Sequence, residues 1–220
     1  MEFQSCDASV VRSIKQRELL NTWLRAAARH RPLPLVEDFQ PDRVGDELAD
    51  MMGLDVIGHG DSARFLITQA GNTLSTTYGS DHFNPADPAN RYLDNAIGPE
   101  RYARVVALYR ACLKHQRPAY SISTVQDADN KDVSYERLLL PFGRGDAVEQ
   151  IVGSYKSISI EGGFKIKNLM GLKPKAVPVI LVRAIIDRDF APNPASRHLA
   201  DDVIELDQAE LDQALNSIKP

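Results

Sequence analysis

The sequence predicts an α+β fold in which one five-stranded antiparallel sheet is covered by helices. Two extended segments come first, at residues 52–57 and 64–69, and the glycine-containing loop between them is typical of a hairpin. A helix is predicted at residues 99–116. Three more extended segments joined by turn-forming sequences follow it, at 118–126, 134–142 and 150–160. Because strands linked by tight turns pair antiparallel, this order favours one sheet over alternating helices and parallel strands.

The chain begins with a predicted helix that flanks the sheet domain. Apolar side chains recur there at helical spacing, at Val10, Ile14, Leu20, Trp23, Leu24 and Ala27. The segment Arg31-Pro32-Leu33-Pro34 ends this helix, since a residue that precedes proline is disfavoured in helical backbone angles. We therefore divide the chain into a flanking helix at 1–31, a central domain at 32–163 and a C-terminal extension at 164–220.

The central helices are placed by their terminal residues. Residues 71–78 form a short predicted helix closed by Gly79, and the proline-containing stretch 80–90 is a predicted surface loop. Pro99 suits the first turn of the long helix. Its buried face is predicted from the spacing of Val105, Leu108, Tyr109 and Cys112. These helices must cover one sheet face, so we expect a closed interior between helices and sheet.

The C-terminal extension differs in character from the domain before it. Lysines cluster between residues 165 and 175, and a short apolar piece follows at 177–186. An acidic terminal helix is predicted at 207–217. We interpret the whole extension as a tail attached to the domain.

The composition excludes several classes of protein. A formal net charge of −4 argues against bulk attraction to nucleic acid. No apolar run approaches the length of a membrane span, and the N-terminal residues lack the features of a secretion signal. The two cysteines, Cys6 and Cys112, suggest neither a metal site nor a disulfide framework. These features favour a cytoplasmic protein.

Sequence motifs of common enzymes are missing. The chain has no glycine-rich phosphate loop, no nucleophile elbow and no His-Glu-x-x-His pattern. The acidic pairs Asp46-Glu47 and Asp201-Asp202 lie in polar stretches without a partner base, and we interpret them as surface turns. A non-enzymatic protein is therefore expected.

Several short motifs together resemble a known family. They are Leu20 with Trp23 and Leu24, Arg31-Pro32-Leu33-Pro34, Asp38 with Pro41, Arg64-Phe65, Gly71, Tyr78-Gly79, Arg117-Pro118, Tyr135-Glu136-Arg137-Leu138-Leu139-Leu140-Pro141 and Ile151-Val152-Gly153. In their order and spacing, over residues 16–160, they resemble a PAS domain, in particular the PAS family widespread in alphaproteobacteria (the fifth PAS family). The resemblance implies a PAS fold and a role in bacterial signalling, and it brings no catalytic residues. The loop at 80–85 is longer than the family pattern, and the extension after Phe164 does not match it.

A small molecule bound in the predicted interior would meet a limited set of side chains. The candidate pocket residues are Tyr78, His82, Tyr109, Tyr135, Glu136 and Arg137. On a strand, Glu136 faces opposite to Tyr135 and Arg137. Two interpretations stay open. Either Glu136 or Arg137 points into a ligand cavity, or one of them forms a structural ion pair with the loop at 31–38, because a buried charge needs a partner. The sequence identifies no cofactor.

The apolar stripe of the first helix is the main candidate contact surface. It packs either on the sheet or on a second chain, and PAS domains commonly dimerise through such flanking helices. Leu20, Trp23 and Leu24 are therefore candidate contacts in a homodimer or with a partner protein. Leu169 and Met170, which lie among the lysines of the extension, are the second candidate contacts.

These observations predict a signalling regulator that binds a small molecule and passes its state to a partner protein by contact. The first alternative is a ligand-free scaffolding or localisation adaptor. The second is a haem or redox sensor centred on His82 or Cys112.

Overall fold

The computed structural model describes residues 2–29, 33–42, 44–74, 92–126, 132–159 and 177–187. The helices are α1 (Ile14–Arg29), α3 (Leu93–Ile97) and α4 (Pro99–His115), with 3-10 turns at η1 (Ala8–Val10), η2 (Val36–Asp38), η3 (Val44–Asp46), η4 (Leu48–Asp50) and η5 (Gly60–Ser62). The strands are β1 (Gln4–Cys6), β2 (Met51–Ile57), β3 (Arg64–Ala70), β4 (Ala119–Gln126), β5 (Asp132–Phe142), β6 (Gln150–Ser159) and β7 (Val179–Ile186). None of the described helices is both long and apolar enough to cross a membrane.

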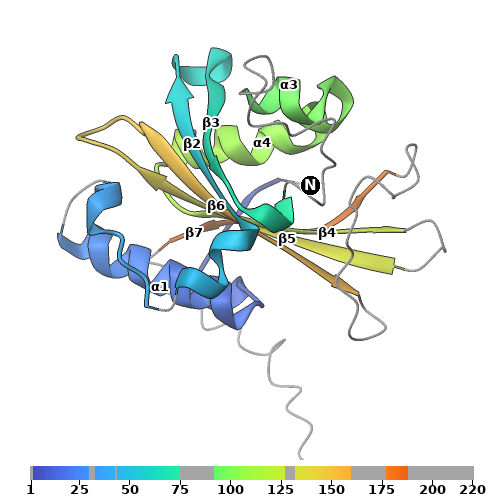
Figure 1. Ribbon diagram of the computed structural model, residues 1–220, viewed down its shortest axis with the longest axis horizontal. Helices are drawn as coiled ribbons and strands as arrows, with labels where there is room; N and C mark the ends of the chain where they lie inside the picture. The colour runs from blue at the N-terminus through green and yellow to red at the C-terminus, as the bar shows by residue number, and fades with distance from the viewer. Residues whose placement is uncertain are drawn as a thin grey trace, which may run out of the picture. The chain divides into compact units, whose positions relative to one another are not determined.

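The strands of the described residues form one mixed sheet in the order β1-β7-β4-β5-β6-β2-β3 (Figure 1). Every neighbouring pair is antiparallel except β1 with β7, which is parallel. The five extended segments predicted from the sequence are therefore neighbours, β4-β5-β6-β2-β3, and the α+β class is confirmed. Helices α3 and α4 fall between β3 and β4 in the chain.

The predicted number of strands was wrong, because the sheet has seven strands and not five. Residues 179–186, which belong to the piece at 177–186 interpreted from the sequence as part of a tail, form β7 along the outer edge of β4. The last three residues of β7 are buried, and β1 pairs with them. A three-residue strand has too little pattern to be recognised in a sequence, and β1 exists only because β7 supplies its backbone partners.

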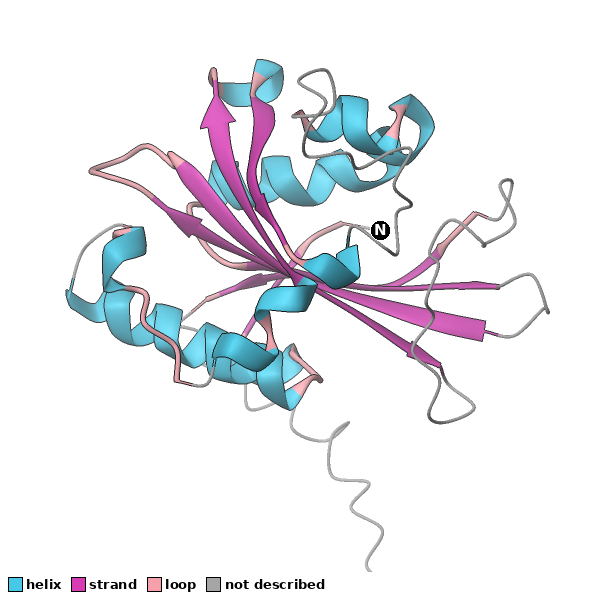
Figure 2. Cartoon of the chain, in the orientation of Figure 1, coloured by secondary structure: helices cyan, strands magenta, loops and turns pink. Residues whose placement is uncertain are grey.

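Both faces of the sheet are covered, which gives two hydrophobic cores (Figure 2). Helices α3 and α4 pack on one face, where Phe65, Tyr109 and Leu139 meet. Helix α1 packs on the other face, where Leu20 and Trp23 join side chains of β4, β5 and β7. The sequence predicts a covered interior only between the central helices and the sheet, and it leaves open whether the apolar stripe of α1 packs on the sheet or on a second chain. In the structure Leu20, Trp23 and Ala27 of this stripe lie on the sheet, whereas Ile14 is 67% exposed.

Local residue chemistry ends the elements near the predicted positions. Pro99 occupies the first turn of α4, and Gln116 adopts a left-handed conformation at its end, with φ of 52°. Gly58 and Gly60 have positive φ angles in the β2–β3 connection, which residues with a Cβ rarely adopt. For the predicted helix at 71–78 only the first residues are described, and the predicted loop at 80–90 and terminal helix at 207–217 lie outside the described residues.

Candidate functional site

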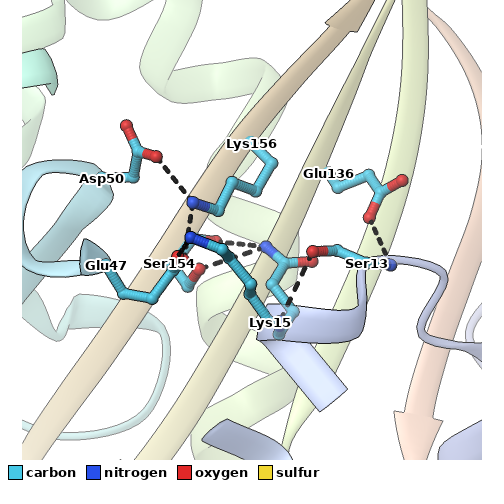
Figure 3. Close-up of polar contacts among 8 residues, drawn as sticks. Ser13, Lys15, Glu47, Asp50, Glu136, Ser154 and Lys156 are labelled. Atoms are coloured by element: carbon cyan, nitrogen blue, oxygen red, sulfur yellow. Dashed lines mark hydrogen bonds and ion pairs between the residues drawn. The ribbon is translucent and has the colours of Figure 1, made fainter. Parts of the chain in front are cut away.

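A band of polar side chains lies between α1 and the sheet, inside an otherwise apolar layer (Figure 3). We call it the α1 seam. It consists of Ser13, Lys15, Gln16, Glu47, Asp50, Tyr120, Glu136, Ser154 and Lys156. Ser13 directly precedes α1, and the other residues come from α1, from the 44–50 segment and from strands β4, β5 and β6. The seam therefore connects elements that are distant in sequence.

Glu136 of β5 caps the N-terminus of α1. Its carboxylate accepts hydrogen bonds from the backbone N–H of Ser13 at 3.3 Å and from the Tyr120 hydroxyl at 3.0 Å. The carboxylate also lies at the positive end of the helix dipole, which favours a negative charge there. Glu136 is only 2% exposed, so these contacts replace the water that it loses on folding.

The residues Ser13 to Gln16 form a capping-box sequence that is used in an unusual way. The hydroxyl of Ser13 accepts the backbone N–H of Gln16 at 3.4 Å, as a capping box requires. The side chain of Gln16 does not return to Ser13, however, because its amide donates to the carbonyl and the hydroxyl of Ser154 in β6, at 3.0 and 3.3 Å. Glu136 fills the vacant capping role. This arrangement fixes α1 to two strands at once.

Lys156 anchors the other side of the seam. Its ammonium lies 2.6 Å from carboxylate oxygens of both Glu47 and Asp50, and Lys15 of α1 lies 2.8 Å from the second oxygen of Glu47. Lys156 comes from β6, so these ion pairs connect α1, the 44–50 segment and the sheet. The sequence pattern of Asp46-Glu47 predicts an acidic surface turn. For Glu47 this prediction is wrong, because the residue is buried and paired with two lysines that are distant in sequence.

Burial also controls the protonation of one hydroxyl in the seam. Loss of water raises the pKa of Tyr120 well above its ordinary value, and the neighbouring Glu136 raises it further. The Tyr120 hydroxyl therefore stays protonated and donates a hydrogen bond to Glu136. It also accepts a hydrogen bond from the backbone N–H of Arg12 at 3.2 Å.

On the opposite face of the sheet a tyrosine pair connects β6 to α4. The hydroxyls of Tyr109 and Tyr155 lie 2.7 Å apart, and the ring of Tyr109 contacts that of Phe65 with centroids 4.9 Å apart. The ring of Tyr155 lies over Gly153, where a Cβ would overlap its hydroxyl. Strand β6 thus bonds to α4 through Tyr155 and to α1 through the adjacent Ser154.

The predicted pocket residues separate between the two faces. Tyr109 lies in the core between α4 and the sheet, as expected. By the alternation of β5, Tyr135 and Arg137 share the face of Leu139, which is also the α4 face. Glu136 points to α1 instead, so the interpretation that places it in a cavity under the central helices is wrong. Its predicted partner in the loop at 31–38 is replaced by Ser13 and Tyr120.

The predicted contact residues are mostly internal. Leu20 is fully buried and Trp23 is 3% exposed, and the Trp23 indole donates to the carbonyl of Pro141 at 2.7 Å. Both side chains therefore belong to the chain's own core and are not available to a second chain. Leu24 is partly buried at the edge of the same core. The remaining candidates, Tyr78, His82, Leu169 and Met170, lie outside the described residues.

Cys112 is a core residue with little reactivity. It is fully buried on α4, and its thiol lies 3.9 Å from the carbonyl of Leu139. Burial raises the pKa of the Cys112 thiol well above its ordinary value, so the reactive thiolate is scarce. This environment weighs against a redox sensor centred on Cys112.

An open groove of about 430 Å³ lies where the 35–37 segment meets the end of β2 and the β5–β6 turn. Its lining includes Val36, Val56 and Arg144. Asp55 and Gln150 also line it and bond to each other at 2.9 Å. The groove lies at the ends of strands, away from the helix–sheet interior in which the sequence predicts a ligand.

Comparison of the chain with models of known families, with curated proteins and with solved structures finds no match. The site is therefore interpreted from its geometry. Nothing in the sequence pattern marks Tyr120, Ser154 or Lys156 as members of the α1 seam. Of the residues at the start of α1, Ser13 and Gln16 have a recognisable signal, because their spacing is that of a capping box.

Proposed function

We propose that this chain is a non-enzymatic signalling regulator of the PAS type, which passes its state to a partner protein by contact. The arrangement of its central elements supports the proposal. Five neighbouring antiparallel strands are covered on one face by helices inserted between β3 and β4, as the resemblance implies. Two motifs of that resemblance, at 135–141 and 151–153, lie in the paired strands β5 and β6.

The observation that carries the proposal is the double attachment of β6. Tyr155 bonds to Tyr109 of α4 on one face, and Ser154 bonds to Gln16 of α1 on the other. Adjacent residues of a strand move together, so a displacement of α4 reaches α1 through a single peptide unit. A ligand in the helix–sheet interior would shift the population of α1 arrangements if it bound one of them more tightly.

A ligand-free adaptor is the second candidate function, and one observation favours it. The described part of the interior between α4 and the sheet is packed with large side chains, including Phe65, Tyr109 and Tyr155. In an adaptor the same attachment would serve only to hold α1 in place, and the partner would recognise a constant surface.

Hydrogen exchange on a pair of tyrosine variants tests the attachment. Tyr109→Phe removes the hydroxyl that meets Tyr155, and we expect amide exchange in the first turns of α1 to rise about fivefold, the effect of losing one net hydrogen bond. Tyr102→Phe on the same helix is the matched control and should leave α1 unchanged. Unchanged exchange in α1 of the Tyr109 variant would reject the regulator.

Native mass spectrometry separates the two candidate functions. A mass excess in the folded chain that disappears on denaturation would identify a bound small molecule and favour the sensory regulator. The mass of the bare chain, together with the exchange effect in α1, would favour the adaptor.

A further inference from the structure

Helix α1 presents a row of arginines on the face that points away from the sheet. Arg17, Asn21, Arg25 and Arg29 are all exposed and follow one another at intervals of four residues. Residues at this spacing form a continuous ridge along a helix, and a span of twelve residues is about 18 Å long. We call these four residues the arginine ridge. The opposite face of α1 supplies Leu20, which is fully buried, so the ridge is held in a fixed orientation.

The charge of the ridge is not neutralised by the described part of the chain. No described acidic residue pairs with Arg17 or Arg29, and Arg25 donates only to the hydroxyl of Thr22, at 2.9 Å. Glu18 is the one acidic residue of α1. Lys15, in contrast, is paired with Glu47 in the α1 seam. The ridge is therefore a concentrated positive surface on a chain whose net charge is −4.

The chemistry of the ridge selects the kind of partner. A guanidinium donates two parallel hydrogen bonds to a carboxylate, and a helix with acidic residues at every fourth position would match the spacing of the ridge. The chain as a whole carries a formal net charge of −4, so a broad anionic surface, such as duplex nucleic acid or a bilayer, would be repelled beyond the ridge. A narrow acidic helix would not.

We propose that the arginine ridge is the docking surface for an acidic helix of a partner protein. This inference rests on the proposed function and names the partner's chemistry. It also explains why α1 is attached so firmly to β6, because a ridge that moves with the sheet reports the state of the domain. A single exposed ion pair contributes little, so recognition depends on several arginines together and weakens as salt rises.

Site-specific photo-crosslinking in cells that naturally produce the protein tests the proposal. A photoreactive amino acid replaces Asn21 in the middle of the ridge, and in a second strain it replaces Ala103, an exposed position of α4. We expect an adduct at Asn21 whose attached peptide is rich in aspartate and glutamate. The triple variant Arg17→Gln, Arg25→Gln, Arg29→Gln should lower its yield at least about tenfold. The matched triple variant Arg101→Gln, Lys114→Gln, Arg144→Gln should not.

The possible outcomes separate the two proposals. No adduct at Asn21, an adduct to nucleic acid or lipid, or an adduct that the ridge variant leaves intact would overturn the arginine ridge as a protein-docking surface. An adduct at Ala103 alone would reject the ridge but keep a regulator that acts by contact. No adduct at either position would count against both. Thermal melting of the two triple variants should match that of the original chain, because the altered side chains are exposed or partly exposed.

Discussion

The carboxylate of Glu136 lies 3.3 Å from the backbone nitrogen of Ser13, so a strand residue caps α1 through a residue that lies 123 positions earlier in the chain. The helix would otherwise leave this partly buried N–H without an acceptor, since the expected capping side chain, Gln16, is bonded to Ser154. The stability of α1 therefore depends on the sheet as much as on its own residues.

Replacing Glu136 should detach the start of α1. Glu136→Ala leaves the Ser13 N–H and the Tyr120 hydroxyl without their acceptor, and we expect a loss of about 2–3 kcal/mol in the free energy of unfolding. Glu136→Gln keeps an acceptor oxygen and should cost about 1 kcal/mol. Urea denaturation measures both values. The emission of Trp23, the single tryptophan of the chain, reports the packing of α1 independently.

The exposed residue Glu37 provides the control for this change. Glu37→Ala should stay within about 0.5 kcal/mol of the original chain. An equal loss in the Glu136 and Glu37 variants would show that the cap contributes nothing specific.

The main features of the fold could be predicted from the sequence because they rest on local patterns. Alternation and turns located five strands, and the spacing of Leu20 and Trp23 located α1. Which sheet face each element covers was not predictable, because it depends on contacts between residues far apart. Strand β1, which pairs with β7, and the ion pair of Lys156 with Glu47 also depend on residues far apart in the chain and could not be predicted. The sequence left open whether Glu136 points into a ligand cavity or has a structural partner. Its partner is the backbone N–H of Ser13, and a backbone group gives no signal in a sequence.

The ion pairs of Lys156 should be strongly stabilising as a unit. Lys156→Met removes the cation that Glu47 and Asp50 share, and it leaves Glu47, which is 5% exposed, with Lys15 alone. We expect a loss of about 3 kcal/mol, typical of breaking a buried pair by removing one partner. Because the site is shielded from solvent, the loss should persist in high salt. Denaturation at low and high salt measures it.

Lys114, an exposed residue at the end of α4, is the matched control for this substitution. Lys114→Met should have little effect at either salt concentration. If high salt abolished the effect of Lys156→Met, the ion pairs would be behaving as exposed surface pairs. This result would contradict the role of Lys156 in stabilising the α1 seam.

A methyl group at Gly153 should disturb the tyrosine pair. The Cβ of Gly153→Ala would overlap the ring and hydroxyl of Tyr155, so this ring has to move away from Tyr109. Overpacking of this kind costs about 1–3 kcal/mol. Gly45→Ala is the control, since nothing lies within 4 Å of its Cβ position, and it should be neutral or slightly stabilising. Equal effects of the two substitutions in thermal melts would contradict the close packing of Tyr155.

The buried thiol of Cys112 should make the protein less stable in alkali. Burial raises the pKa of Cys112 in the folded chain above its ordinary value of 9.0, so the folded state retains a proton that the unfolded state loses. The stabilisation is complete below pH 9 and falls as the pH rises above it, by about 1.4 kcal/mol per pH unit. Tyr120 adds a similar loss above its own ordinary value of 10.0.

Urea denaturation between pH 7 and pH 10 measures this loss, with Cys112→Ala as the variant that should remove most of it. The variant is expected to be less stable at pH 7, because it leaves a small cavity, but its stability should depend less on pH. Cys6→Ala is the control. The Cys6 thiol also has a raised pKa, through burial and Asp7, but it is partly exposed and should account for the smaller part of the slope. An unchanged slope in Cys112→Ala would mean that the thiol meets solvent in the folded chain, and the packed core between α4 and the sheet would have to be reconsidered.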